Sequence, residues 1–268
     1  MNTLAGPRSI SLAIRDVKDG LLNVPVWSML AWQEVRQRYR RSMLGPFWLT
    51  ISMGALVAGM GPLYGRLFGQ DLGEYFPYLA IGIVVWQLMA SLINDSTQVF
   101  IGAEQYIKQI RLPFTIHVMR MVWRNAIIFG HNLVIVLLVL IFFLPTWAWW
   151  APLSILGMAA ILINGVWIGL LFGLVCARFR DIAQIISSVV QIAFFFTPVM
   201  WKPEMLGRHQ WAAQVNPLHH LLEVVRGPLL GARPSVTSWA VVVLITAAGF
   251  AFTTLLFSRY RARIAYWV

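Results

Sequence analysis

The side chains best suited to chemistry lie between residues 200 and 235. The adjacent pair His219 and His220, followed by Glu223, has the residue types of a zinc site. Adjacent residues point to different sides of a helix, which argues against a shared metal ion. Glu204 and Glu223 have the types needed for a catalytic acid and base, but nothing in the sequence fixes their separation. We therefore predict no metal site and leave the role of the two histidines open.

Signatures of the common enzyme families are absent from the sequence. None of the three lysines completes the GxxxxGK[ST] loop that holds nucleotide phosphates, and neither HExxH nor GxSxG occurs. The single cysteine, Cys176, excludes an intramolecular disulfide. The ten acidic residues are scattered along the chain. The sequence therefore predicts that this chain is not an enzyme and that it carries no catalytic residues and no cofactor.

Polar side chains recur at helical spacing within apolar segments. The clearest stripe is Gln87, Ser91 and Asn94. Polar groups are costly in lipid, so such stripes either hold helices together by hydrogen bonds or line a path for a polar substrate, and both interpretations stay open. Another stripe contains Arg120 and Arg124, which are expected to snorkel at the inner surface. The aromatic residues considered as faces for sugar rings along such a path are Phe47, Tyr64, Phe68, Tyr75 and Trp86.

The composition predicts the elements that carry these side chains. Of the 268 residues, 59% are hydrophobic and 12% are charged, whereas roughly a quarter of the residues of soluble domains are charged. Apolar runs near the ~20 residues that cross a bilayer as a helix recur along the chain. We therefore predict an all-α integral membrane protein with a single transmembrane domain over residues 1–268. Its six predicted spans are 44–66, 76–98, 120–144, 152–176, 182–201 and 236–257.

The distribution of basic residues predicts the orientation of these spans. The chain has 21 Lys and Arg against 10 Asp and Glu, for a net charge of +11. With the N-terminus inside, sixteen of the 21 basic residues fall on the inner side. This is the bias that places loops in the cytoplasm, so both termini are predicted to be cytoplasmic. Because the membrane explains the basic excess, no nucleic-acid partner is expected.

The segment 26–43 combines positive charge with an apolar face. The apolar side chains at spacings of three and four are Trp32, Val35, Tyr39 and Met43. Such a helix lies in the lipid headgroup layer. The segment is either a simple anchoring flank or an interface helix that also supports a cytoplasmic partner. The arginines expected to contact lipid headgroups are Arg36, Arg38, Arg40 and Arg41.

The stretch 202–235 is the only sizeable segment expected on the outer side of the membrane. An amphipathic helical pattern within it is made by Leu218, Leu221, Leu222 and Val225. We expect two short re-entrant or surface helices here, which cover the outer mouth of the bundle.

Six short motifs occur in order along nearly the whole chain. They are RQRYRRSMLGPFW before the first span, EQYIKQIRLPF between the second and third, ARFRDI between the fourth and fifth, FFFTPVMW at the end of the fifth, VNPLHHLLEVVRGPLLG outside, and YRARIAYWV at the C-terminus. Together they resemble the membrane subunit of type-2 ATP-binding-cassette (ABC) polysaccharide exporters, the O-antigen, capsule and teichoic-acid permeases. The resemblance implies a homodimer that binds two copies of a separate ATPase subunit, with ATP and magnesium on that partner. It also implies that the segment 202–235 forms short periplasmic gate helices between spans five and six.

The resemblance also implies where the ATPase binds. In this family the loop between spans two and three is a coupling helix that sits in a cleft of the ATPase, and the corresponding residues here are 102–112. The residues expected to contact the ATPase are Glu104, Tyr106, Lys108, Arg111, Arg180 and Asp181. The first four lie at spacings that give a helix a charged face beside packing surface. For the last two, a local salt bridge is the alternative interpretation.

The expected function is export of a lipid-linked polysaccharide, in particular O-antigen, across the inner membrane. Capsule or teichoic-acid export is an alternative with the same architecture, as is efflux of a small molecule or a lipid. A membrane-embedded glycan-modifying enzyme and a scaffold for cytoplasmic proteins are alternatives of a different class. The scattered acidic residues weigh against the enzyme, and the polar stripes weigh against the scaffold.

Overall fold

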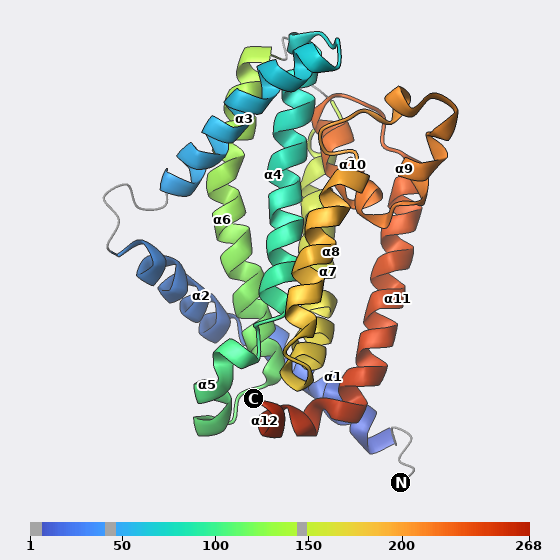
Figure 1. Cartoon of the computed structure of the whole chain (residues 1–268). Coiled ribbons are helices and arrows are strands. Elements are labelled where there is room, and N and C mark those ends of the chain that lie inside the picture. Colours follow the sequence, from blue (N-terminus) through green and yellow to red (C-terminus); the bar gives the residue numbers. More distant parts are fainter. Residues whose placement is uncertain (1–6, 41–46, 144–148) are drawn as a thin grey trace.

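The first and last helices, α1 (Pro7–Leu22) and α12 (Ile264–Trp267), lie at the same end of a helical bundle (Figure 1). The computed structural model describes residues 7–40, 47–143 and 149–268, and every regular element in these ranges is a helix. The prediction of an all-helical chain is confirmed. The helices in these ranges that are long and apolar enough to span a membrane are α4 (Leu72–Ser96), α6 (Phe114–Phe143), α7 (Leu153–Arg178) and the stretch Val236–Trp267, which begins with α11 (Val236–Tyr260).

Two further helices, α3 (Phe47–Leu67) and α8 (Ile182–Phe196), correspond to the remaining predicted spans. Residues 44–46 of the predicted first span lie outside the described residues. The helix α8 has 15 residues and ends well before the predicted boundary at residue 201. It ends there because Thr197, which precedes Pro198, has an extended backbone, as residues before proline usually do.

The helix α4 forms the centre of the bundle. It packs against α3, α6, α7, α8 and α10 (Pro217–Leu229) and contributes most of its apolar side chains to the core. Its N-terminus is capped by Asp71, whose carboxylate accepts hydrogen bonds from the N–H groups of Gly73 and Glu74. Its contacts with the neighbouring helices place α4 at the centre of the described helices, where most of its side chains are buried.

The N-terminal residues form two helices where the sequence predicts one. The helix α2 (Val24–Tyr39) corresponds to the predicted interface helix, of which residues 41–43 lie outside the described residues. Trp27, Ala31 and Val35 recur every four residues and are buried, with Trp27 edge-on to Trp123 of α6 at 5.7 Å. Trp32, predicted to share a face with Val35, is exposed. The additional helix α1 packs against α6 and α11.

A short helix, α5 (Glu104–Gln109), lies at the end of the bundle that holds α1 and α12 (Figure 1). It follows directly after one turn of 3₁₀ helix, η1 (Ile101–Ala103). It is shorter than the predicted 102–112. Ile110 is already extended, and Pro113 keeps the residues before it from resuming a helix. The helix α5 therefore projects from the bundle on a short, stiff connection to α6.

The segment 202–235 folds at the opposite end (Figure 1). It contains η2 (Pro203–His209), α9 (Trp211–Val215) and α10, and the predicted apolar face of α10 is turned inward: Leu221, Leu222 and Val225 are buried. Asn216 caps α10 by accepting a hydrogen bond from Leu218 N–H. The backbone of α10 approaches α7 so closely that a Cβ at Gly157 would collide with the Val224 carbonyl oxygen. This close approach joins α10 firmly to the bundle.

Candidate functional site

The helix α5 presents both charged and apolar side chains to its surroundings. Glu104 and Lys108, one helical turn apart, form an ion pair of 2.6 Å. The hydrogen bond and charge of Lys108 lower the pKa of Glu104, and the charge of Arg180 lowers it further. Tyr106 and Ile110 are about half exposed. An exposed aromatic ring beside an exposed aliphatic side chain is typical of a surface that binds another protein.

The loop between α7 and α8 lies close to this helix. Arg180 is near enough to influence Glu104, and Arg178, Phe179, Arg180 and Asp181 are all exposed. Across the described residues, no ion pair joins Arg180 to Asp181, so the local salt bridge considered from the sequence does not form. The helix α12 also packs against α5. We call the exposed residues of α5, of the 178–181 loop and of α12 the α5 surface.

Tyr106, in the α5 surface, lies next to a cluster of charged side chains. The guanidinium of Arg120 lies over the Tyr106 ring, 5.9 Å from its centroid. Arg120 Nε is 3.1 Å from a Glu34 carboxylate oxygen, and Arg124 Nη1 is 2.6 Å from the other. These contacts link α5 to α6 and, through Glu34, to α2.

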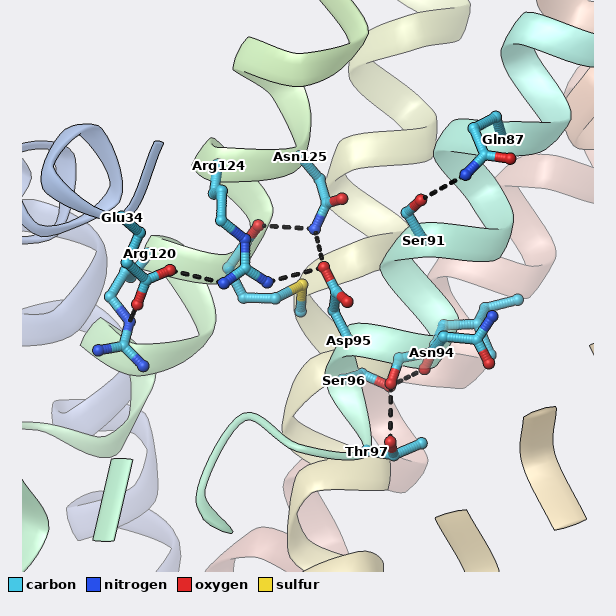
Figure 2. A network of polar contacts seen from close by, with 12 residues as sticks. Glu34, Gln87, Ser91, Asn94, Asp95, Ser96, Thr97, Arg120, Arg124 and Asn125 are labelled. Atoms are coloured by element: carbon cyan, nitrogen blue, oxygen red, sulfur yellow. Dashed lines mark hydrogen bonds and ion pairs between the residues drawn. The ribbon is translucent and has the colours of Figure 1, made fainter. Parts of the chain in front are cut away.

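The cluster continues from α6 to α4. Arg124 Nη2 is 2.7 Å from an oxygen of Asp95, which also accepts a hydrogen bond of 2.9 Å from Asn125 Nδ2 (Figure 2). We call this cluster the charge network; its members are Glu34, Asp95, Arg120, Arg124 and Asn125. Two carboxylates face two guanidiniums, so the charges balance. Each of these four side chains is less than one third exposed, and the ion pairs are therefore poorly screened by solvent.

The charge network corrects one expectation from the sequence. Arg120 and Arg124 do not snorkel at the surface, because their side chains are only 10% and 20% exposed. Their partner Glu34 lies on a different helix, about 90 residues away in sequence. No local pattern in the sequence indicates such a pairing. The unusual placement of two arginines at the edge of a predicted span was the only available signal.

A second polar junction lies at the start of α6, directly after α5. The carboxylate of Asp16, on α1, accepts hydrogen bonds from the N–H groups of Phe114 (3.2 Å) and Thr115 (3.1 Å) and from the Thr115 hydroxyl (2.9 Å). The same carboxylate forms an ion pair of 2.8 Å with Arg261, in η3 (Arg261–Arg263). Asp16 is 3% exposed. It caps α6 from outside that helix and holds the C-terminal segment in place.

The predicted polar stripe lies on the open side of α4. Gln87 is exposed although its neighbours Trp86 and Leu88 are buried, and it donates a hydrogen bond of 3.3 Å to the Ser91 hydroxyl (Figure 2). Ser91 and Asn94 are half-buried one and two turns further on. Gln87 and Ser91 are thus available to a ligand or to a second chain, whereas the Asn94 side-chain oxygen is buried and has no hydrogen-bond partner among the described residues.

The five aromatic residues considered as faces for sugar rings divide into two groups, those with accessible rings and those with buried rings. Phe47 is exposed, and Tyr64 and Phe68 are half-buried neighbours with ring centroids 5.7 Å apart. Tyr75 is fully buried and donates a hydrogen bond of 2.6 Å to the Met200 carbonyl oxygen. Trp86 is buried against Phe194. Tyr75 and Trp86 are therefore packing residues in this structure, because neighbouring side chains cover the ring faces that a sugar would need.

The structure describes the side chains of two of the four arginines expected to contact lipid headgroups. Arg36, on α2, and Arg40, directly after the last residue of α2, are exposed and line a shallow polar hollow together with Gln33 and Gln37. Arg41 lies outside the described residues, and the side chain of Arg38 is not among those that the structure describes.

The histidines and glutamates singled out from the sequence meet at one cavity beside α10. His219, His220, Glu204 and Glu223 all line it. Both ring nitrogens of His220 already have protein partners, the Ser238 hydroxyl at 3.0 Å and the Gln214 carbonyl oxygen at 2.7 Å. Within the described part of the chain, no three His, Cys, Asp or Glu side chains are grouped so that they could hold a metal ion.

Comparisons with known proteins agree with this architecture. The family model described as "ABC-2 type transporter" matches residues 25–230. Two curated proteins of Klebsiella pneumoniae, each named "O-antigen export system permease protein RfbA", are similar to the chain. One is 22% identical over 195 residues, which cover 71% of this chain and 74% of the relative. The other is 22% identical over 246 residues, which cover 87% of this chain and 91% of the relative. The chain thus belongs to the ABC-2 type transporter family and is a transport permease.

Proposed function

We propose that this chain is the membrane subunit of an ABC exporter that moves a lipid-linked polysaccharide, O-antigen, out of the cytoplasm. The proposal rests on the α5 surface, which exposes Tyr106 and Ile110 to a partner. Tyr106 in turn contacts Arg120 of the charge network. The names of the two relatives support O-antigen as the substrate. Capsule and teichoic-acid export remain alternatives with the same architecture.

The proposed assembly contains two copies of this chain and two copies of a separate ATPase subunit, which binds ATP and magnesium. In each copy α3, α4, α6, α7, α8 and α11 serve as the six spans. The α5 surface and both termini then face the cytoplasm, and α10 lies at the outer side of the membrane. In this orientation α2 is the interface helix, and Arg36 and Arg40 lie where lipid phosphates bind guanidinium groups.

The contacts suggest how ATP binding moves the spans. When the ATPase displaces α5, Tyr106 moves Arg120, with which it is in contact. The ion pairs of the charge network then transmit this displacement to α2 and α4 together. Asp16 ties the start of α6 to α1 and to the C-terminal segment, so these elements move with α6. Buried ion pairs suit this role because their geometry is well defined and costly to break.

The polysaccharide path is proposed to follow the open polar side of α4. Gln87 and Ser91 offer amide and hydroxyl groups to sugars, and Asn94 follows them two turns along the same stripe. The helix α8, which packs beside α4, exposes Gln184 and Ser188. Several weak contacts of this kind allow a polymer to slide, whereas tight binding at one point would stop it. Efflux of a small apolar molecule does not require such a stripe.

The coupling role of α5 is tested by changing its two exposed apolar side chains. The double change Tyr106→Ala with Ile110→Ala is expected to reduce the ATPase rate of the complex at least tenfold, because truncating buried aromatic anchors of an interface typically costs about 2 kcal/mol or more. The rate is measured on the ATPase subunit co-purified with this chain in mild detergent. Arg233→Ala, an exposed residue of the segment 202–235 at the other end of the bundle, is the control and should leave the rate unchanged.

Two results would contradict the proposal. If no ATPase subunit co-purifies with the unchanged chain, the exporter function itself is wrong. If the complex forms and the double variant retains the full rate, the ATPase docks elsewhere and α5 is not the coupling element.

A further inference from the structure

The cavity beside α10 has no part in the proposed coupling between the ATPase and the spans. It has a volume of about 860 Å³ and lies among η2, α9, α10 and the first turn of α11. Gln70, in the turn between α3 and α4, also reaches it. This volume is within the range of about 300–1,000 Å³ that is usual for small-ligand sites. We call it the α10 cavity.

Two buried side chains at the α10 cavity have polar atoms without a partner. His219 is 8% exposed, and its Nδ1 makes no hydrogen bond within the described structure. Arg226 is 1% exposed; its two terminal nitrogens are bonded to Pro198 O and Glu223, but its Nε makes no hydrogen bond within the same residues. Leaving a buried polar atom unpaired costs about 1–3 kcal/mol. Both atoms are enclosed by the protein rather than open to the cavity, so an occupant is bound by the accessible polar groups of the lining instead.

The charges of the cavity are balanced, which argues against a strongly charged ligand. Lys202 and Arg226 are matched by Glu204 and Glu223, and Arg226 is 2.9 Å from Glu223. The rest of the polar lining consists mainly of amides and hydroxyls. It includes Gln70, Gln210, Gln214, Ser235 and Thr237. Such groups both donate and accept hydrogen bonds, as the hydroxyls of an uncharged sugar do.

The cavity is also connected to the segment that follows α8. Arg226 donates a hydrogen bond of 2.7 Å to the Pro198 carbonyl oxygen and stacks on the Tyr78 ring, 3.9 Å from its centroid. The Tyr78 hydroxyl in turn donates to the carbonyl oxygens of Pro198 and Trp201. Arg226 and Tyr78 thereby join the wall of the cavity to the chain between α8 and η2.

We propose that the α10 cavity binds neutral sugar units of the exported polysaccharide at the outer side of the membrane. The proposal rests on the proposed function, because it takes the ligand to be the exported polymer. A sugar held there occupies the polar wall and hinders backward sliding of the polymer between ATPase cycles. The site is separate from the polar stripe of α4 and gives each copy of the chain its own outer contact with the glycan.

The test measures binding of a soluble glycan to the complete complex with its ATPase subunit. The probe is the surface polysaccharide of the source cells, released from lipid by mild acid and cut to short oligosaccharides of a few repeats. Saturable binding is expected by calorimetry. Thr237→Trp and Gln214→Trp replace exposed rim side chains with a bulky one, and each is expected to weaken binding at least tenfold. Arg233→Ala, in the same outer segment but outside the lining, is expected to change binding less than twofold.

The outcomes separate this proposal from the proposed function. If the complex forms and hydrolyses ATP but the oligosaccharide does not bind, or binds equally to both tryptophan variants, the sugar site is wrong and the exporter function stands. If no ATPase subunit co-purifies with the unchanged chain, the proposed exporter function is itself wrong. Co-purification of each tryptophan variant with the ATPase verifies that the variant is folded.

Discussion

Replacing Asp16 with alanine is expected to lower the free energy of unfolding of the chain by about 4 kcal/mol, because removing one partner of a buried ion pair typically costs about 3–5 kcal/mol. The carboxylate is buried and makes five polar contacts, three to the start of α6 and two to the Arg261 guanidinium. In its absence two N–H groups of α6 lose their cap, and Arg261 is left without its counter-charge. The C-terminal segment is therefore expected to separate from α1.

The prediction is measured as unfolding of the purified chain in mixed detergent micelles with increasing SDS. Asp19→Ala is the matched control, because Asp19 lies on the same helix, is half exposed and, among the described residues, forms an ion pair only with Arg15, one turn away. An exposed pair of this kind contributes about 0–1 kcal/mol. Asp16→Asn, which keeps an acceptor for the cap but loses the charge, should fall between the two. Equal stability of Asp16→Ala and Asp19→Ala would contradict the role of Asp16 as a junction.

Replacing Arg124 with alanine is expected to destabilise the chain by about 3 kcal/mol and to reduce ATP-driven export strongly. Arg124 bridges Glu34 and Asp95, at 2.6 and 2.7 Å, so its loss separates α2 from α4. Among the described residues, the Asp95 carboxylate then keeps only its hydrogen bond from Asn125, and Arg120 is the one guanidinium left beside Glu34. The network then carries excess negative charge in a poorly solvated position.

The same SDS titration measures the loss of stability. Arg36→Ala removes an exposed arginine from the neighbouring α2 and should leave the stability nearly unchanged. The ATPase rate of the complex distinguishes a coupling role from a purely structural one. If Glu34→Gln, which weakens the network without removing a side chain, leaves the complex intact but lowers the ATPase rate, the network transmits motion. If Arg124→Ala matches Arg36→Ala in both measurements, the network is not functional.

The features that the sequence predicts well are those with local physical causes. The apolar face of α10 follows from the helical spacing of Leu221, Leu222 and Val225, and all three are buried. The polar stripe of Gln87 and Ser91 follows from the same spacing, and it lies on the open side of α4. Both patterns are detectable because a helix repeats every 3.6 residues.

The features that the sequence does not predict depend on residues far apart in the chain. Asp16 and Arg261 are 245 residues apart, and each looks like an ordinary surface charge in its own segment. Aromatic side chains are ambiguous for a related reason. Tyr75 and Phe47 look equally suitable for a sugar face, but only the packing around each ring decides that Tyr75 is buried and Phe47 is exposed.

The measurement that most directly tests the central claim is the amount of polysaccharide on the surface of source cells that lack this chain. We expect surface polysaccharide to disappear, lipid-linked polymer to accumulate on the inner membrane, and the unchanged chain to restore export. The Tyr106→Ala and Ile110→Ala double variant should fail to restore it. An unchanged amount and length of surface polysaccharide in the deleted cells would contradict the account.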